Sequence, residues 1–97
     1  ARTADTISRS VRVRVAGRVQ GVGYRYFAVR AAESCGVSGF VRNLEDGAVE
    51  VRAHGSGEAV SQFLASLRSG PSASRVEDFE VLDELAAGGF RGFEVRY

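Results

Sequence analysis

The sequence contains no lysine, and it has one cysteine, one histidine and one proline in 97 residues. Without lysine there can be no Schiff-base chemistry and no P-loop lysine, so an anion site must use guanidinium or backbone N–H groups. A single cysteine, Cys35, cannot form an internal disulfide, and a single histidine, His54, cannot anchor a structural zinc site. We therefore expect no metal and no cofactor.

Long hydrophobic runs and a strong net charge are also missing. No apolar stretch approaches the roughly 18 residues that span a bilayer, and the N-terminus lacks the hydrophobic segment of a secretion signal. Thirteen basic and twelve acidic residues leave a net charge of +1, which gives little nonspecific attraction to nucleic-acid phosphates. These features predict a cytoplasmic protein that binds neither membranes nor nucleic acid.

What is present is the composition of one folded domain. Hydrophobic residues make up 44% and charged residues 26% of the chain, as in ordinary globular domains, and the length provides for one core. Residues 1–10 are polar and show no periodicity, so we expect a flexible tail there and a domain over 11–97. The sequence does not indicate the oligomeric state, and we expect a monomer.

The hydrophobic pattern alternates between the period of strands and that of helices. It predicts a strand over 11–15, a helix over 24–35, strands over 37–44 and 48–54, a helix after Ser56 that ends at Gly70-Pro71, a strand over 76–85 and a short strand over 93–97. This order is typical of an α+β ferredoxin-like sandwich with a βαββαβ arrangement. We expect a four-stranded antiparallel sheet with two helices on one face and a short final strand.

A glycine-rich segment leads from the first predicted strand into the first predicted helix, and it reads Gly17-Arg18-Val19-Gln20-Gly21-Val22-Gly23-Tyr24-Arg25. Glycines let successive N–H groups turn toward one point, and a helix start adds unpaired donors, so the segment can hold an anion such as phosphate or a carboxylate. Arg25 opposes the helix dipole unless an anion binds there. The alternative is an ordinary turn with Arg25 directed to solvent, and the fingerprints of nucleotide-binding loops are missing.

A polar amide stands out in the strand over 37–44. Asn43 shares the alternation of Val37 and Val41 and not that of Arg42, which places its amide on the apolar face, where burial is costly without partners. Asn43 could orient a water molecule, or it could cap a turn by bonding its own backbone. Glu45 and Asp46 after it are expected to be solvated turn residues.

The two segments together resemble the acylphosphatase family. The family's phosphate-binding signature is similar to Val19-Gln20-Gly21-Val22-Gly23-Tyr24-Arg25, and its second signature is similar to Gly39-Phe40-Val41-Arg42-Asn43 with Gly47, Val49 and Gly55 behind it. The similarity runs from about residue 11 to residue 97. It implies the ferredoxin-like fold and metal-independent hydrolysis of acyl phosphates to a carboxylate and phosphate.

The resemblance also implies a role for each site residue. Arg25 matches the arginine that binds the phosphoryl group, Asn43 matches the asparagine that orients the attacking water, and the backbone of residues 19–24 matches the phosphate cradle. The terminal carboxylate of Tyr97 is expected to help orient Arg25. Acetyl, carbamoyl and 1,3-bisphosphoglycerate-type acyl phosphates are the expected small-molecule substrates.

Three other interpretations remain open from the sequence. A non-catalytic anion-binding or regulatory module on the same fold would need Arg25 but not Asn43. A binder of single-stranded RNA would show exposed aromatics in a basic field, which the net charge disfavours. A unit of a larger carbamoyl-transferring protein is the third, but no linker follows Tyr97, so we expect an independent protein. Cys35 is expected to pack against the sheet, and His54 is assigned no chemistry.

Overall fold

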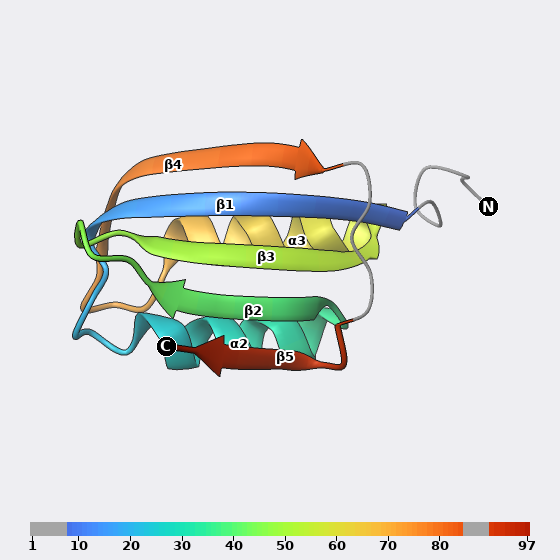
Figure 1. Ribbon diagram of the computed structural model, residues 1–97, viewed down its shortest axis with the longest axis horizontal. Helices are drawn as coiled ribbons and strands as arrows, with labels where there is room; N and C mark the ends of the chain where they lie inside the picture. Colours follow the sequence, from blue (N-terminus) through green and yellow to red (C-terminus); the bar gives the residue numbers. More distant parts are fainter. Residues whose placement is uncertain (1–7, 85–89) are drawn as a thin grey trace.

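The computed structural model of the chain describes residues 8–84 and 90–97. Within them, helices and strands follow one another in the order predicted from the sequence, as Figure 1 shows. The elements are β1 (Ser8–Arg18), α2 (Tyr24–Cys35), β2 (Ser38–Asn43), β3 (Val49–Ser56), α3 (Gly57–Ser69), β4 (Arg75–Glu84) and β5 (Phe93–Arg96). The prediction of an α+β ferredoxin-like fold is confirmed.

The sheet formed by the described strands has the order β4-β1-β3-β2-β5, so β4 and β5 are its edges. β1 pairs antiparallel with β3 and β4, and β2 pairs antiparallel with β3. β5 pairs in parallel with β2, with Val95 opposite Val41. The prediction of a four-stranded antiparallel sheet is therefore wrong, because the short final strand is a fifth, parallel member. The alternating pattern of residues 93–97 predicts a strand but not the strand with which it pairs. That pairing is determined by the free edge of β2 and by the burial of Phe93 and Val95 against the core.

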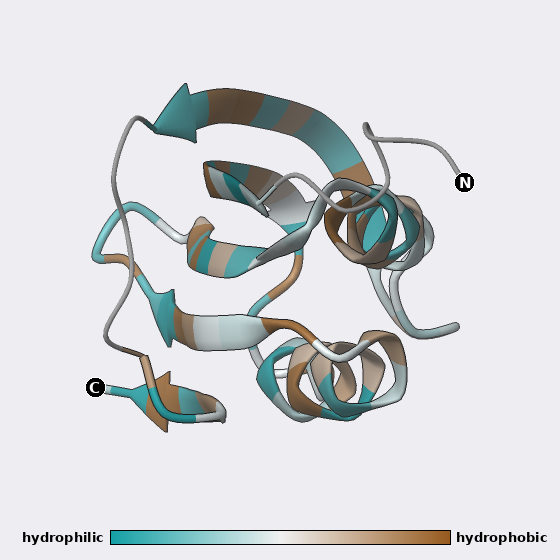
Figure 2. Ribbon diagram, turned by 90° about the vertical axis from the view of Figure 1, so that its right-hand side faces the viewer, coloured by the Kyte–Doolittle hydropathy of each residue, from teal (hydrophilic) through white to brown (hydrophobic). Residues whose placement is uncertain are grey.

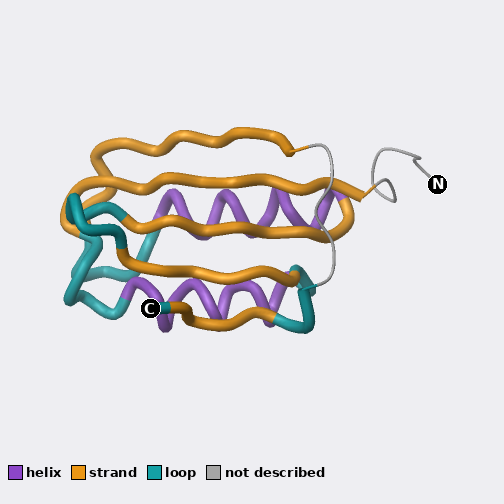
Figure 3. The backbone as a smooth tube through the Cα atoms, in the orientation of Figure 1, coloured by secondary structure: helices purple, strands orange, loops and turns teal. Residues whose placement is uncertain are grey.

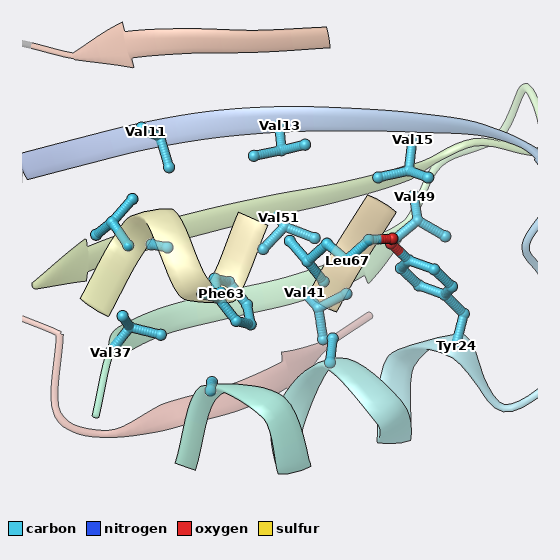
Figure 4. Close-up of a cluster of buried hydrophobic side chains, with 14 of the residues drawn as sticks. Val11, Val13, Val15, Tyr24, Val37, Val41, Val49, Val51, Phe63 and Leu67 are labelled. Atoms are coloured by element: carbon cyan, nitrogen blue, oxygen red, sulfur yellow. The ribbon is translucent and has the colours of Figure 1, made fainter. Parts of the chain in front are cut away.

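Both helices cover one face of the sheet (Figure 2). The core between these layers is built of strand valines and a few helix residues, which Figure 4 shows in close-up. α3 contributes Phe63 and Leu67, both fully buried, whereas α2 contributes Tyr24 at its start and the small side chains Ala28 and Ala32 beyond it. These alanines let α2 lie close to β2 and β5 and so fix the position of the helix start. No described helix is long and apolar enough to cross a bilayer.

The ends of the helices match the sequence prediction. Ser56 is the N-cap of α3 and accepts a hydrogen bond from the Ala59 N–H at 3.1 Å, which satisfies one of the open donors of that helix. Gly36 ends α2 in the left-handed conformation, with φ of +78°, a conformation that costs glycine little.

The main differences from the prediction concern the limits of two strands. β1 begins at Ser8, so Ser8–Ser10 lie in the sheet opposite Ser56–His54 of β3 and not in a tail. Their sequence shows no hydrophobic alternation, and they form a strand because β3, which extends to Ser56, supplies their partners. Residues 1–7 lie outside the described residues, as does Leu85, the predicted end of the strand that is β4.

Gly39 lies near the start of β2, opposite Ala53 of β3, and its φ is +147°. A Cβ there would overlap the backbone carbonyl of Arg52. We expect Gly39→Ala to lower the free energy of unfolding by about 3 kcal/mol, because both backbone strain and overlap oppose it. Urea unfolding would measure the loss.

The control is Gly47→Ala in the β2–β3 turn, where φ is +94° but no atom lies within 4 Å of the added Cβ. That variant should lose only about 1 kcal/mol, from backbone strain alone. Equal losses in the two variants would show that close packing at Gly39 does not matter.

Candidate active site

The segment between β1 and α2 is buried at its two ends and exposed to solvent in its middle. Val19 and Tyr24 are each only 1% exposed. Between them Gly21 and Gly23 are exposed, with φ of +74° and +81°, backbone conformations that side-chain-bearing residues rarely adopt. The loop therefore presents backbone, not side chains, at the start of the helix.

Tyr24 connects this helix start to the other helix. Its hydroxyl donates a hydrogen bond to the Leu67 carbonyl on α3 at 2.6 Å (Figure 4). Burial raises the pKa of the Tyr24 hydroxyl, because the phenolate would be poorly solvated. The first turn of α2 is thus held by both the core and a buried hydrogen bond.

The N–H groups of this turn are left open. Among the described residues, no hydrogen-bond acceptor pairs with a backbone N–H from Gly21 to Tyr26; the next N–H, that of Phe27, bonds to the Gly23 carbonyl at 2.9 Å. Gly23, the N-cap, offers no side chain, and the first turn contains no acidic residue. Open N–H groups at a helix start carry a partial positive charge, so this surface favours an anion.

Arg25 adds a full positive charge to the same turn and is half-buried. Its guanidinium carbon lies 5.2 Å from the centre of the Tyr97 ring, which is a cation–π contact. The sequence predicts that the Tyr97 carboxylate orients Arg25. Among the described residues, Arg25 instead contacts the Tyr97 ring and forms no ion pair with that carboxylate. Tyr97 itself is 97% exposed, so this contact restrains the guanidinium only weakly.

Asn43 is the last residue of β2 and lies opposite Val49 of β3. Its Oδ1 atom is buried and has no hydrogen-bond partner. A buried acceptor without a partner costs about 1–3 kcal/mol, and such atoms in folded proteins often belong to sites that bind water or ligand. The turn-capping alternative would have given this oxygen a backbone partner.

Arg25 and Asn43 meet in one cavity of about 300 Å³. Its wall comes from the β1–α2 loop, the first turn of α2, the last residue of β2 and the end of the chain, and Figure 3 shows the course of these backbone segments. Its wall is formed by Val19, Gly21, Gly23, Tyr24, Arg25, Tyr26, Asn43, Val95 and Tyr97. Two predicted residues of the phosphate-binding segment are not in the wall: Val22 packs against the core, and the Gln20 side chain bonds to the β2–β3 turn.

The sequence interpretation did not include Tyr26 or Val95. Tyr26 is 67% exposed at the rim of the cavity, and only its place next to Arg25 could have suggested it. Val95 reaches the wall because β5 pairs in parallel with β2, and alternation alone does not reveal that pairing.

The chemical groups in the cavity wall are restricted. None of its described residues is an aspartate, glutamate, histidine or cysteine, and no cluster of metal-ligating side chains is found in the part of the chain that the structure describes. His54 lies outside the cavity, with Nδ1 2.6 Å from the Ser10 hydroxyl, and Cys35 packs half-buried against the core. The site can hold an anion and orient a neutral molecule, but it offers no side chain for proton transfer near neutral pH.

Comparisons with known proteins agree with this arrangement. The family model named Acylphosphatase matches residues 11–95. The acylphosphatase of Rubrobacter xylanophilus is 51% identical over 92% of this chain and 81% of its own length, and that of Syntrophotalea carbinolica is 48% identical over 90% and 95%. A crystal structure of acylphosphatase from Bacillus subtilis superposes with a TM-score of 0.89 at 36% identity, covering 92% of this chain and 99% of the other.

Proposed function

Because the chain belongs to the acylphosphatase family, we propose that its loop and Arg25 hold the phosphoryl group of the substrate while Asn43 orients the attacking water. The enzyme hydrolyses acyl phosphates to a carboxylate and inorganic phosphate. The proposal concerns which residues perform each part of this reaction. The buried, unpartnered Oδ1 of Asn43, in the same cavity as Arg25 and the open helix start, is the observation that carries it.

The phosphoryl group is held by two kinds of donor. The open N–H groups of the loop and first helical turn that line the cavity bond to its oxygens, and the Arg25 guanidinium neutralises its charge. Phosphoryl transfer places charge on the equatorial oxygens, so fixed donors around them stabilise the transition state. The Tyr97 ring contacts the guanidinium and leaves its charge free, whereas a carboxylate partner would neutralise that charge.

Water attacks phosphorus from the side of Asn43. The Asn43 Oδ1 accepts a hydrogen bond from the water and directs its lone pair at phosphorus. The new bond forms between the water oxygen and phosphorus, while the bond between phosphorus and the acyl oxygen breaks. The electron pair leaves with the carboxylate, and the protons of the water pass to phosphate oxygen and solvent. The leaving carboxylate, whose conjugate acid has a pKa of about 4, needs no general acid, which fits a described wall without aspartate, glutamate or histidine side chains.

Hydrolysis of benzoyl phosphate, followed by ultraviolet absorbance in the presence of a chelator, tests this function. We expect turnover that the chelator does not change. Failure to hydrolyse would instead favour the non-catalytic anion-binding module, although that module has no need for Asn43. Loss of activity on chelation would contradict the expected metal independence.

The substrate class, the oligomeric state and the cellular location are also part of the proposal. We infer a small acyl phosphate, with acetyl, carbamoyl and 1,3-bisphosphoglycerate-type compounds as candidates, and a monomer acting in the cytoplasm. The net charge of +1 supports a small-molecule substrate over nucleic acid. Comparing kcat/KM among these compounds would test the substrate, and measuring the mass in solution would test the monomer.

The kcat should change less than about twofold between about pH 6.5 and 8.5, where the substrate phosphate is mostly a dianion. The described wall contains none of the side chains that usually change charge in this range, and burial raises the pKa of Tyr24, which keeps it neutral. Initial rates at saturating benzoyl phosphate would measure the profile. A bell-shaped profile centred near neutral pH would reveal an acid or base outside the proposed site.

A further inference from the structure

The side-chain amide of Gln20 bridges two segments that meet at the active site. Its Nε2 atom donates to the Leu44 carbonyl at 2.8 Å and to the Ala48 carbonyl at 2.9 Å. A primary amide nitrogen has two protons, so both donors are used. Gln20 therefore bonds to both ends of the β2–β3 turn at once.

Each end of this bridge lies one residue from the site. Gln20 directly precedes Gly21 of the loop, and Leu44 directly follows Asn43. Among the described residues, the two bonds from Gln20 are the only hydrogen bonds between residues 19–23 and residues 43–48. The bridge is thus the direct polar connection between the phosphate-binding loop and the strand end that carries the proposed water-orienting amide.

The turn on the far side of the bridge is closed by its own bonds. The Leu44 N–H bonds to the Ala48 carbonyl at 2.8 Å, and the Ala48 N–H bonds to the Asp46 carboxylate at 3.0 Å. Because the turn is closed, a displacement of Leu44 moves the end of β2 with it. The loop on the near side, residues 19–23, has exposed Gly21 and Gly23, and the described structure shows no backbone hydrogen bond between two of its residues.

We propose that Gln20 is a positioning residue for the hydrolysis, and that its amide sets the distance between the bound phosphoryl group and Asn43. The proposal rests on the roles given above to the loop and to Asn43. Attack needs the water oxygen and phosphorus at about 3–3.5 Å, and a misplacement of about 1 Å costs roughly 100-fold in rate. The bridge acts on the water and not on phosphate binding, since the Gln20 side chain is absent from the described cavity wall.

Gln20→Met tests this role, because methionine has a similar length and apolar stem but no donor. We expect kcat for benzoyl phosphate to fall by about 10- to 100-fold, with the inhibition constant of inorganic phosphate changed less than about threefold. The matched control is Gln62→Met on α3, where the glutamine is exposed, and its kcat should equal that of the wild type. A wild-type kcat in Gln20→Met, or an equal loss of phosphate affinity and kcat, would overturn the proposal.

A double-mutant cycle with Asn43→Ala separates positioning from a general structural role. If Gln20 acts through Asn43, adding Gln20→Met to Asn43→Ala should slow turnover by less than about twofold, because no amide remains to be positioned. If the two effects multiply, Gln20 acts elsewhere and the proposal fails. Residual turnover at high enzyme concentration provides the readout.

A second variant covers the case in which methionine disturbs the loop. Gln20→Glu keeps the shape but replaces the donor with a carboxylate facing two carbonyl oxygens, so its kcat should fall at least as far. Thermal melting of each variant identifies an assay temperature at which it is folded. Wild-type turnover and the loss in Asn43→Ala alone test the proposed function, so failure of that function is distinguishable from failure of the Gln20 role.

Discussion

Replacing Arg25 with glutamine is expected to lower kcat/KM for benzoyl phosphate by about 1000-fold or more. The guanidinium is the one positive side chain in the described wall of the cavity, and glutamine cannot neutralise a phosphoryl group that gains charge on its equatorial oxygens. Affinity for inorganic phosphate should fall together with kcat, because the charge contacts both substrate and transition state. Initial rates and competitive inhibition by phosphate would measure the two effects.

The stability of this variant should change by less than about 1 kcal/mol. Removing a cation from the first turn of α2 relieves repulsion from the helix dipole, and this offsets the lost contact with the Tyr97 ring. The control is Arg68→Gln on α3, which loses a similar contact, since the Arg68 guanidinium lies 4.5 Å from the centre of the Phe79 ring. The control should keep full activity. More than about a tenth of wild-type activity in Arg25→Gln would exclude the assigned role.

Replacing Asn43 with alanine should lower kcat by about 100- to 1000-fold, the usual cost of losing one preorganised polar group. Unlike Arg25→Gln, this variant should keep its affinity for inorganic phosphate within about threefold, because Asn43 is proposed to contact water and not phosphate. The pair of variants therefore separates binding from attack. Enzyme kinetics combined with calorimetric titration of phosphate would measure both quantities.

The fold should tolerate this change, since it removes a buried oxygen that has no partner. Ser38→Ala at the opposite end of β2 is the control, as it loses only a long contact of 3.4 Å to the His54 carbonyl. Its kcat should match that of the wild type. If phosphate affinity falls in step with kcat in Asn43→Ala, Asn43 holds the phosphoryl group and the water must be oriented by another residue.

The parts of the site that the sequence predicted are those that local rules determine. Positive φ at Gly21 and Gly23 and the inward alternation of Asn43 follow from backbone sterics and the period of a strand, so the loop and the amide could be predicted. The neighbours of these residues depend on which distant segments meet. Val95 enters the wall through a parallel pairing, and Gln20 reaches a turn more than twenty residues away; neither relation has a signature in local sequence. The start of β1 was missed for the same reason, because β3 supplies the partner.

The position of β4 at the edge of the sheet also bears on how copies of this protein behave at high concentration. An edge strand exposes unpaired backbone groups to which another chain can add, which is a route to aggregation. Five of the ten residues of β4 are acidic, and two such edges brought together repel one another. The acidic residues that oppose edge-to-edge pairing therefore lie on β4, at the opposite edge of the sheet from β5.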